Sequence, residues 1–358
     1  MKIAIIGAGI AGLACALECE KLGVIPDVFE RDYSVGWPWL SINFWPRVIF
    51  RNLGDPIDYI KKNYNIEIAP ASECKNIILK SPKQEIKVKG QLGYFIIRGK
   101  GNESIENQLI RKLKKQTAIH YNSLVDYKEL SSKYDYVVVA TGKDDEAREL
   151  KVWEDEGIMN IVGGIALGSF HDKMSILYLN TEYAGTGYAR ISPFSPTEAI
   201  VGLYDNRHDE SDTDSLFAKF LKYEKLEKLK FLYKFTPPPF ATGRVKKFKV
   251  GNILLTGRAA GLTERFLGVG CPEALMSGVL AARAMILNED YEELIKPLKN
   301  HVENISSFRK AIQNYENKDF DRLLSRIGSP GVKKLIYNTP INFTGSFGAL
   351  LKNIQKIK

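Results

Sequence analysis

Three glycines near the start of the chain have the spacing of a dinucleotide-binding turn. Gly7, Gly9 and Gly12 lie between an apolar run at 2–6, which predicts a buried strand, and an apolar-periodic segment that predicts a helix. In such a turn the first glycine permits a tight bend, the second lets the backbone approach a pyrophosphate, and the third lets the helix pack against its strand. The diphosphate would bind the free N–H groups of the first helical turn, where Ala11 lies.

An acidic residue follows where a ribose would need one. The segment DVFE (27–30) predicts a second strand that ends in Glu30, and Arg31 comes next. We expect Glu30 to accept hydrogen bonds from the ribose and Arg31 to belong to the same cofactor site. A GxGxxG pattern alone is weak, but strand, glycines, helix, strand and terminal acid all occur here in order. The pattern by itself leaves NAD and FAD open.

Two distant segments repeat the ending of a strand in a glycine turn. YDYVVVATG (134–142) and NILLTGRAAG (252–261) both have this form, and a helix rich in small residues is predicted at 272–287. A nucleotide domain assembled from three pieces of chain is less typical of NAD dehydrogenases, which more often complete the binding unit in one stretch. The sequence therefore favours FAD.

These segments resemble flavoproteins of the p-hydroxybenzoate hydroxylase type, and among them most closely the geranylgeranyl reductase family. The opening motif carries the resemblance together with GYFIIRGKGNESIENQLIRKL (93–113), YDYVVVATGKDDEAR, GYARISPFSPTEAIVGLY (187–204) and GRAAGLTERFLGVG (257–270). It implies bound FAD, with the last segment wrapping the ribityl chain and the isoalloxazine. The further cofactor-binding residues that it implies are Arg98, Thr141, Gly142, Arg258, Ala259, Gly268, Val269 and Gly270.

The chain departs from the family pattern at five positions, one of which is Asp145, where Ser is usual. Thr141 stands where Asp is usual, and Arg258 replaces the Asp that hydrogen-bonds the sugar chain of the flavin. A guanidinium cannot accept a hydrogen bond, so we expect Arg258 to turn toward phosphate or solvent. Arg190 and Ser192 replace the Trp and Phe of the reductases' Tyr-x-Trp-x-Phe-Pro motif.

The same motif implies the substrate side of the site, where Tyr188 and Pro193 match the family. Arg190 has two interpretations. Facing the flavin it would pair with a carboxylate or phosphate group, and facing solvent it would be a strand surface residue. Trp37 and Trp39 favour an apolar wall and hence an apolar or aromatic substrate.

No catalytic residue is assigned, since in a flavin reductase the cofactor carries the hydride. Cys271 and Tyr188 are candidate proton donors, and packing alone would also explain each of them. The four histidines have no metal-ligand spacing, so no metal is expected.

The predicted architecture is α/β, with a discontinuous Rossmann-like FAD-binding domain and an interleaved β-rich substrate domain. The FAD domain would take residues 1–55, 93–150 and 243–290. The substrate domain would take 56–92 and 151–242, including one long helix at 213–234, and a helical C-terminal region would take 291–358.

Composition sets the remaining expectations. The 358 residues are 44% hydrophobic and 26% charged, which excludes a disordered, collagen-like or coiled-coil chain. Four cysteines without metal spacing predict reduced thiols, and the lack of a signal peptide or bilayer-spanning run predicts a cytoplasmic protein. A net charge of +9 favours anionic partners, but no nucleic-acid motif accompanies it.

Basic residues gather near the C-terminus. From 322 to 358 there are seven bases and no acid, and apolar residues near the end fall on one helical face. Two interpretations stay open: peripheral contact with anionic membrane, or a helix that caps the substrate domain.

The function predicted from the sequence is that of an FAD-dependent reductase. Reduced flavin would deliver hydride to a carbon–carbon double bond of a small-molecule or lipid substrate, one candidate being a prenyl lipid. NAD(P)H or a reduced redox protein would supply the electrons. One alternative is a flavin-dependent aromatic monooxygenase, and another is a redox-inactive nucleotide- or lipid-binding protein.

Overall fold

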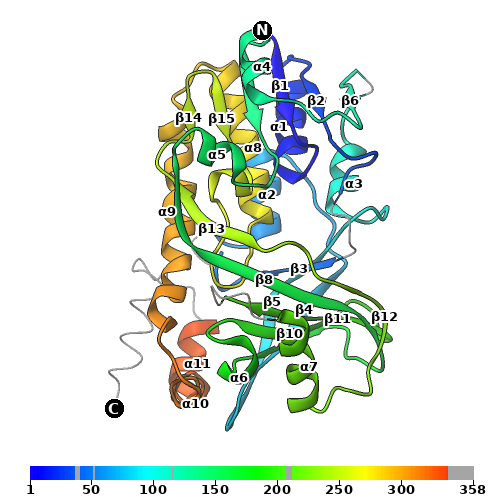
Figure 1. Cartoon of the computed structure of the whole chain (residues 1–358), viewed down its shortest axis with the longest axis vertical. Helices are drawn as coiled ribbons and strands as arrows, with labels where there is room; N and C mark the ends of the chain where they lie inside the picture. Colours follow the sequence, from blue (N-terminus) through cyan, green and yellow to red (C-terminus); the bar gives the residue numbers. More distant parts are fainter. Residues whose placement is uncertain (37–40, 51–52, 115, 207–211, 338–358) are drawn as a thin grey trace.

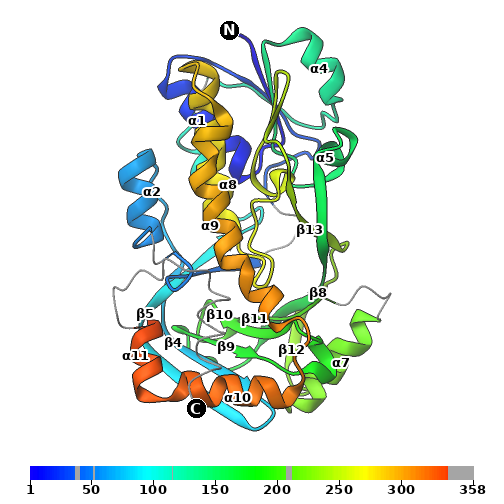
Figure 2. The same cartoon turned by 90° about the vertical axis from the view of Figure 1, so that its left-hand side faces the viewer.

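The computed structural model describes residues 1–36, 41–50, 53–114, 116–206 and 212–337, which form two sheets (Figure 1). The first sheet lies in the upper part of that view and the second in the lower part. The long helix α9 (Tyr291–Ile312) runs from the first part toward the second (Figure 2).

The first sheet has six strands in the order β14-β15-β7-β1-β2-β6 and is parallel except at β14. Three separate stretches of chain supply it, as the sequence predicted. The side chains of its central strands are buried, as expected of a parallel sheet that is covered on both faces. Its strands are β1 (Ile3–Ile6), β2 (Asp27–Phe29), β6 (Ile119–His120), β7 (Tyr136–Val139), β14 (Lys249–Val250) and β15 (Ile253–Leu255).

Two helices pack closely beside this sheet. They are α1 (Ile10–Lys21), which is buried along nearly its whole length, and α8 (Cys271–Ile286). A Cβ on Gly12 would overlap the carbonyl oxygen of Gly7, and one on Gly278 would overlap that of Ala11. The backbones therefore approach each other at positions that only glycine permits. The remaining elements of this part are α2 (Pro56–Tyr64), α3 (Ile105–Ile110), α4 (Tyr127–Lys133), α5 (Asp145–Glu149) and the 3-10 turn η1 (Gly257–Ala260).

The second sheet has nine strands and is mainly antiparallel. Its order is β12-β8-β11-β10-β9-β4-β5-β3, and β13 also pairs with β8, which serves three partners. The strands are β3 (Ser41–Pro46), β4 (Ser72–Ser81), β5 (Gln84–Arg98), β8 (Trp153–Leu167), β9 (Met174–Tyr178), β10 (Tyr188–Pro193), β11 (Glu198–Asp205), β12 (Lys230–Phe235) and β13 (Phe240–Val245).

This second sheet is curled. Helices α6 (Thr181–Ala184) and α7 (Thr213–Tyr223) cover one face, where Phe217 and Phe220 pack against Ala189 and Leu203. On the other face, Ile42 of β3 joins one apolar cluster with Ile200 of β11, although the two strands lie far apart in the strand order. The sheet therefore bends until its β3 edge lies over its middle strands.

The C-terminal region is helical over its described part. After α9 come α10 (Asn317–Gly328) and α11 (Pro330–Tyr337), with a break at Ser329. The apolar side of α10, with Phe320 and Leu324, packs against Ile86 of the second sheet. No helix in the described ranges is long and apolar enough to cross a membrane. The apolar helical face expected near the end of the chain lies outside the described residues.

Three sequence expectations differ from the structure. The helix expected at 213–234 ends at Tyr223, and the KFLYKF segment forms β12, where strand pairing with β8 overrides helical periodicity. The long strand β8 was not predicted. Strand β3 belongs to the second sheet by its pairing with β5, although the predicted FAD domain includes its residues.

The contact between α1 and α8 gives a stability prediction. We expect Gly278→Ala to lower the free energy of unfolding by about 1–3 kcal/mol, because its Cβ overlaps the Ala11 carbonyl. Gly331→Ala is the matched control, since a Cβ there meets nothing within 4 Å in the exposed first turn of α11. Equal unfolding midpoints in urea for both variants would contradict the close approach.

Candidate functional site

The glycine turn between β1 and α1 forms an open cradle. Gly7 has φ of +100°, and a Cβ on it would lie 2.6 Å from the carbonyl oxygen of Ala140. Gly9 precedes α1 in extended conformation, no side chain caps the helix there, and a Cβ on Gly9 meets nothing within 4 Å. No side chain therefore caps this helix terminus or fills the space beside Gly9, as an anion-binding helix terminus requires.

The carboxylate of Glu30 is fixed beside this cradle. It accepts hydrogen bonds from the backbone N–H groups of Ala8 (2.8 Å) and Asp32 (3.0 Å). A carboxylate has about four acceptor positions, so two bonds leave room for ribose hydroxyls. Arg31 lies nearby, with its side chain about half exposed and its Nε 3.9 Å from Asp32.

The other two strand endings meet the same cradle. A Cβ on Gly257 would lie 3.2 Å from the Cβ of Ala11, so η1 contacts the first turn of α1. Ala259 is fully buried in this turn. Gly142 is open, with nothing within 4 Å of a Cβ, and the hydroxyl of Thr141 donates to Glu146 at 2.9 Å.

Two arginines come together at this junction. The Nε of Arg258 donates to the carbonyl of Gly142 at 2.5 Å, and its guanidinium lies 4.7 Å from the centre of the Phe240 ring. Burial and the nearby charge of Arg98 lower the pKa of Arg258 to about 10. The guanidinium of Arg258 thus points toward the carbonyl of Gly142. Of the two directions expected for it, phosphate or solvent, it does not take the solvent direction.

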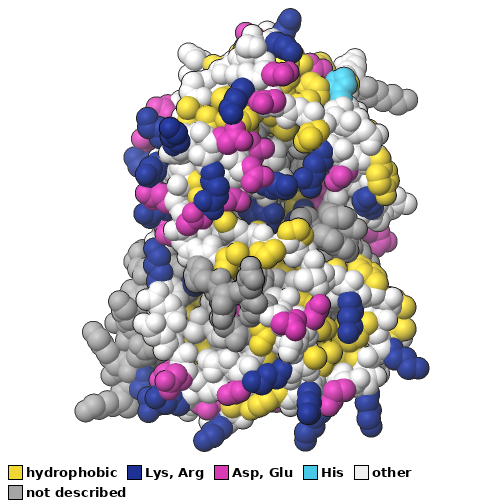
Figure 3. Space-filling model, viewed as in Figure 1, with side chains coloured by type: hydrophobic (Ala, Val, Ile, Leu, Met, Phe, Trp, Pro, Cys, Tyr) yellow, Lys and Arg dark blue, Asp and Glu magenta, His cyan; other side chains and the backbone are white. Residues whose placement is uncertain are grey.

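Arg98 is paired within the protein. Its Nε and Nη2 donate to one oxygen of Glu106, at 2.8 and 2.6 Å, while the other oxygen of that buried carboxylate has no partner. Arg98 also acts electrostatically on Cys271 at the start of α8, and burial raises the pKa of that thiol to about 11. Cys271 is therefore a neutral thiol at pH 7. In the space-filling view, Lys and Arg side chains gather around a hollow in the middle of one face (Figure 3).

The loop before α8 completes the junction. Gly268 has φ of +69°, and the nearest atom to its Cβ would be 3.9 Å away, so this backbone is open. Val269 is buried, its carbonyl accepts from the N–H of Glu264, and Gly270 precedes the first turn of α8. The predicted residues of this loop thus lie together at the N-terminus of a second helix.

Glu264 is a residue that the sequence analysis did not single out. It is 2% exposed, and its carboxylate accepts from the N–H groups of Phe266 (2.7 Å) and Leu267 (2.5 Å). Burial raises the pKa of Glu264 to about 7, although the two N–H groups favour the ionised form. No local sequence pattern marks Glu264, because its burial depends on how the loop folds.

Strand β10 presents Tyr188 and Arg190 on the face of the second sheet opposite α7. The hydroxyl of Tyr188 donates to the carbonyl of Leu267 at 2.6 Å, and burial raises its pKa well above the ordinary value. The hydroxyl proton of Tyr188, a candidate proton donor, is thus hydrogen-bonded to the loop before α8. Arg190 is 8% exposed, so the solvent-facing interpretation is wrong.

One predicted substrate residue is not brought to this point. Alternation along β10 places Pro193 on the α7 face, away from Tyr188 and Arg190. Trp37 and Trp39 lie outside the described residues.

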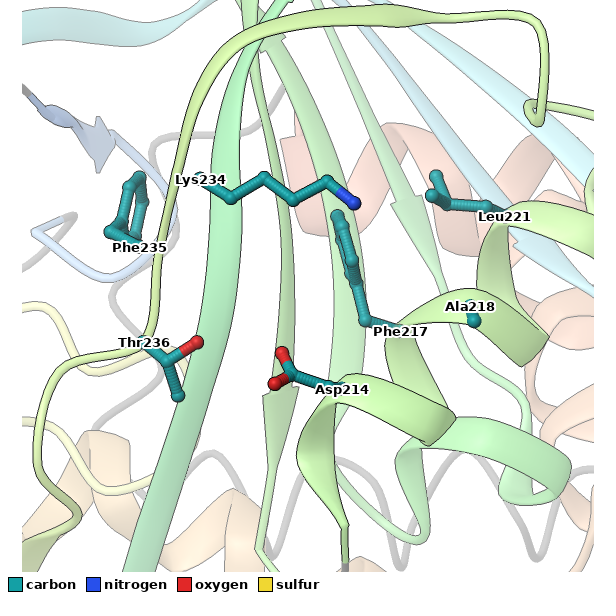
Figure 4. A pocket seen from close by; sticks show the side chains of 7 residues that line it. All are labelled: Asp214, Phe217, Ala218, Leu221, Lys234, Phe235 and Thr236. Atoms are coloured by element: carbon teal, nitrogen blue, oxygen red, sulfur yellow. The ribbon is translucent and has the colours of Figure 1, made fainter.

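A cavity of about 370 Å³ lies elsewhere, where β12 and the residue after it meet α7 (Figure 4). None of the predicted cofactor or substrate residues lines it. Its lining residues are Asp214, Phe217, Ala218, Leu221, Lys234, Phe235 and Thr236. Within the described ranges, no group of three His, Cys, Asp or Glu residues could hold a metal ion.

No protein-family model matches the sequence. The structure is similar to a geranylgeranyl bacteriochlorophyll reductase-like protein from Thermoplasma acidophilum, with a TM-score of 0.75 and 15% identity over 99% of this chain and 96% of that one. It is also similar to a flavin-dependent brominase, with a TM-score of 0.67 and 12% identity over 99% of this chain and 98% of that one. A third similar structure is p-nitrophenol 4-monooxygenase from Pseudomonas putida, with a TM-score of 0.65 and 13% identity over 93% of this chain and 96% of that one.

These similarities establish the fold. The chain shares the fold of these solved structures, and this confirms the α/β fold that the sequence resemblance implied.

The buried Glu264 gives a pH prediction. Its pKa is raised in the folded protein, so the folded state keeps a proton that the unfolded chain has lost between pH of about 4.3 and 7. Its contribution to stability is complete below that window, falls by at most about 4 kcal/mol as pH rises through it, and is constant above. In Glu264→Gln, unfolding midpoints should lose this slope, even if the variant is less stable at every pH. An unchanged slope would show that another group titrates.

Proposed function

We propose that this protein is an FAD-dependent oxidoreductase. The observation that carries the proposal is the open backbone at Gly9, Gly142 and Gly268, three positions from distant segments that lie around one junction. Each leaves space where a side chain would otherwise stand. Gly9 directly precedes α1, and Gly142 follows the end of β7. A dinucleotide that lies across this junction would contact all three.

The residues present fit such a cofactor. The first turn of α1 would hold the diphosphate, Glu30 the ribose, and the loop at 268–270 the flavin ring. Arg258, whose Nε donates to the carbonyl of Gly142, cannot accept hydrogen bonds from the ribityl hydroxyls. When bound, FAD would supply hydride-transfer chemistry, and the protein would supply its position and a water-poor setting.

For the reaction, we propose reduction of a carbon–carbon double bond in an apolar substrate, with prenyl lipids as the first class to test. The apolar inner face of the curled sheet, with Ile42, Ile200 and Phe235, supports an apolar ligand. The similarity to a reductase-like protein has the highest TM-score of the three reported. NAD(P)H or a reduced redox protein would be the electron donor.

The second candidate is an aromatic monooxygenase, which the similarity to p-nitrophenol 4-monooxygenase favours. Oxygen consumption separates the two. A reductase oxidises NAD(P)H or accepts dithionite electrons and yields a saturated product anaerobically, whereas a monooxygenase consumes oxygen in proportion to hydroxylated product.

The first experiment is the visible spectrum of the purified protein, followed by denaturation and identification of the released cofactor. A flavin spectrum with released FAD is the expected result. A colourless protein that does not take up added FAD would overturn the proposal and favour a redox-inactive binding protein.

Gly9 tests the cradle without disturbing the fold. We expect Gly9→Val to lose FAD retention at least about tenfold, because the side chain would occupy the place of the diphosphate. Its thermal midpoint without cofactor should stay unchanged, since a Cβ at Gly9 meets nothing within 4 Å. Gly101→Val is the matched control, because Gly101 is exposed and equally open. Equal FAD retention in both variants would place the diphosphate elsewhere.

Arg258 tests the sugar-chain contact. We expect Arg258→Asp to retain FAD more tightly, by several-fold in equilibrium dialysis, because a carboxylate accepts hydrogen bonds from the ribityl hydroxyls. Weaker retention would show instead that the guanidinium itself holds the cofactor's phosphate.

A further inference from the structure

Arg190 is a buried cation inside the curl of the second sheet. It lies in the middle of β10, paired with Leu177 of β9 and Gly202 of β11, and only 8% of it is exposed. Its Nη2 donates to the carbonyl of Ile42 at 2.9 Å and to the hydroxyl of Tyr204 at 3.2 Å. The guanidinium thus bridges the floor of the sheet and its overlying β3 edge.

The partners of Arg190 are all neutral. Its guanidinium lies 5.5 Å from the centre of the Tyr204 ring, and its Nε is buried without a hydrogen-bond partner. Among the described residues no carboxylate forms an ion pair with it. A cation–π contact and two neutral acceptors offset only part of the cost of burying a charge, which is several kcal/mol.

Arginine cannot relieve that cost by losing its proton at ordinary pH. A bound anion that accepts a hydrogen bond from Nε would balance the positive charge of Arg190 and also give this N–H group a partner. The surroundings on the same face add small polar groups. Ser192, two residues along β10, is fully buried, and its hydroxyl lies 3.3 Å from that of Ser175.

We propose that Arg190 binds the carboxylate of an amphiphilic substrate whose apolar part lies along the inner face of the curled sheet. A single buried cation balances a single negative charge. A diphosphate would leave further negative charge buried without a partner, which is unfavourable in a protein interior. The hydrocarbon part would contact the apolar side chains of the cluster that contains Ile42, Phe44 and Ile200, which are buried in the ligand-free protein.

This site adjoins the cofactor junction. Tyr188 lies on the same face two residues before Arg190, its ring stacks on Tyr204 at 4.5 Å, and its hydroxyl bonds the Leu267 carbonyl of the loop before α8. A carboxylate at Arg190 would therefore fix the acid end of the substrate close to the loop that the proposed function assigns to the flavin ring. The inference deepens that function by naming its substrate class.

The test compares three ligands with one hydrocarbon chain: geranylgeranoic acid, geranylgeraniol and geranylgeranyl diphosphate. Titration calorimetry is performed on the protein as purified and after removal of any cofactor. We expect the wild type to bind the acid at least about tenfold more tightly than the alcohol or the diphosphate. In Arg190→Met this preference for the acid should disappear, whereas Arg190→Lys should keep part of it. Arg322→Met is the matched control, because the Arg322 side chain is exposed and its Nη1 lies 3.4 Å from Asp319 within α10.

A second readout needs no ligand. Removing an unpaired buried cation should not destabilise the free protein, so the thermal midpoint of ligand-free Arg190→Met should equal or exceed that of the wild type. If the variant instead melts well below the wild type, the guanidinium is a structural bridge, and the proposal is wrong.

The outcomes separate this inference from the proposed function. Equal binding of acid and alcohol by a flavin-containing wild type would overturn the Arg190 site alone. A preference for the acid in a protein that never takes up FAD would support the Arg190 site and overturn the oxidoreductase. Tightest binding of the diphosphate, lost in Arg190→Met, would overturn the carboxylate assignment.

Discussion

The close packing of α1 against its strand and against α8 is the constraint on which the candidate site depends. Gly12 and Gly278 let carbonyl oxygens of neighbouring segments approach to distances that any side chain would prevent. Because of that approach, the first turn of α1 contacts the middle of α8 and also lies beside the turn η1, although the three segments are far apart in the sequence. A cofactor that spans α1 and η1 needs this spacing, since helix termini can hold anionic groups only where their N–H groups converge.

The charges around this junction are arranged unequally. Glu30 and Glu264 are each held by backbone N–H groups, and Arg98 is held by Glu106. Arg190 is a buried cation whose two hydrogen-bond acceptors, the Ile42 carbonyl and the Tyr204 hydroxyl, are both neutral. In a protein interior such an unpaired charge is costly, so it marks the place where a ligand would contribute most.

The two sheets provide different groups to the candidate site. The parallel sheet brings its strand ends together at one edge, where backbone N–H groups and glycines are the useful chemistry. The antiparallel sheet alternates its side chains, and its curl encloses one face while α7 covers the other. Tyr188 links the two parts through its bond to Leu267.

The sequence by itself determined the crossover from β1 through α1 to β2, the three-part parallel sheet and the positions of its strands β1, β2, β7 and β15. These features depend on contiguous patterns: buried apolar runs, glycines at fixed spacing and a terminal acid. It could not determine the end of α7 or the strand β12, because pairing with β8 decides between helix and strand there. Nor could it determine the face of Arg190, the pairing of Arg98 or the burial of Glu264, since each depends on groups that only the folded chain brings together.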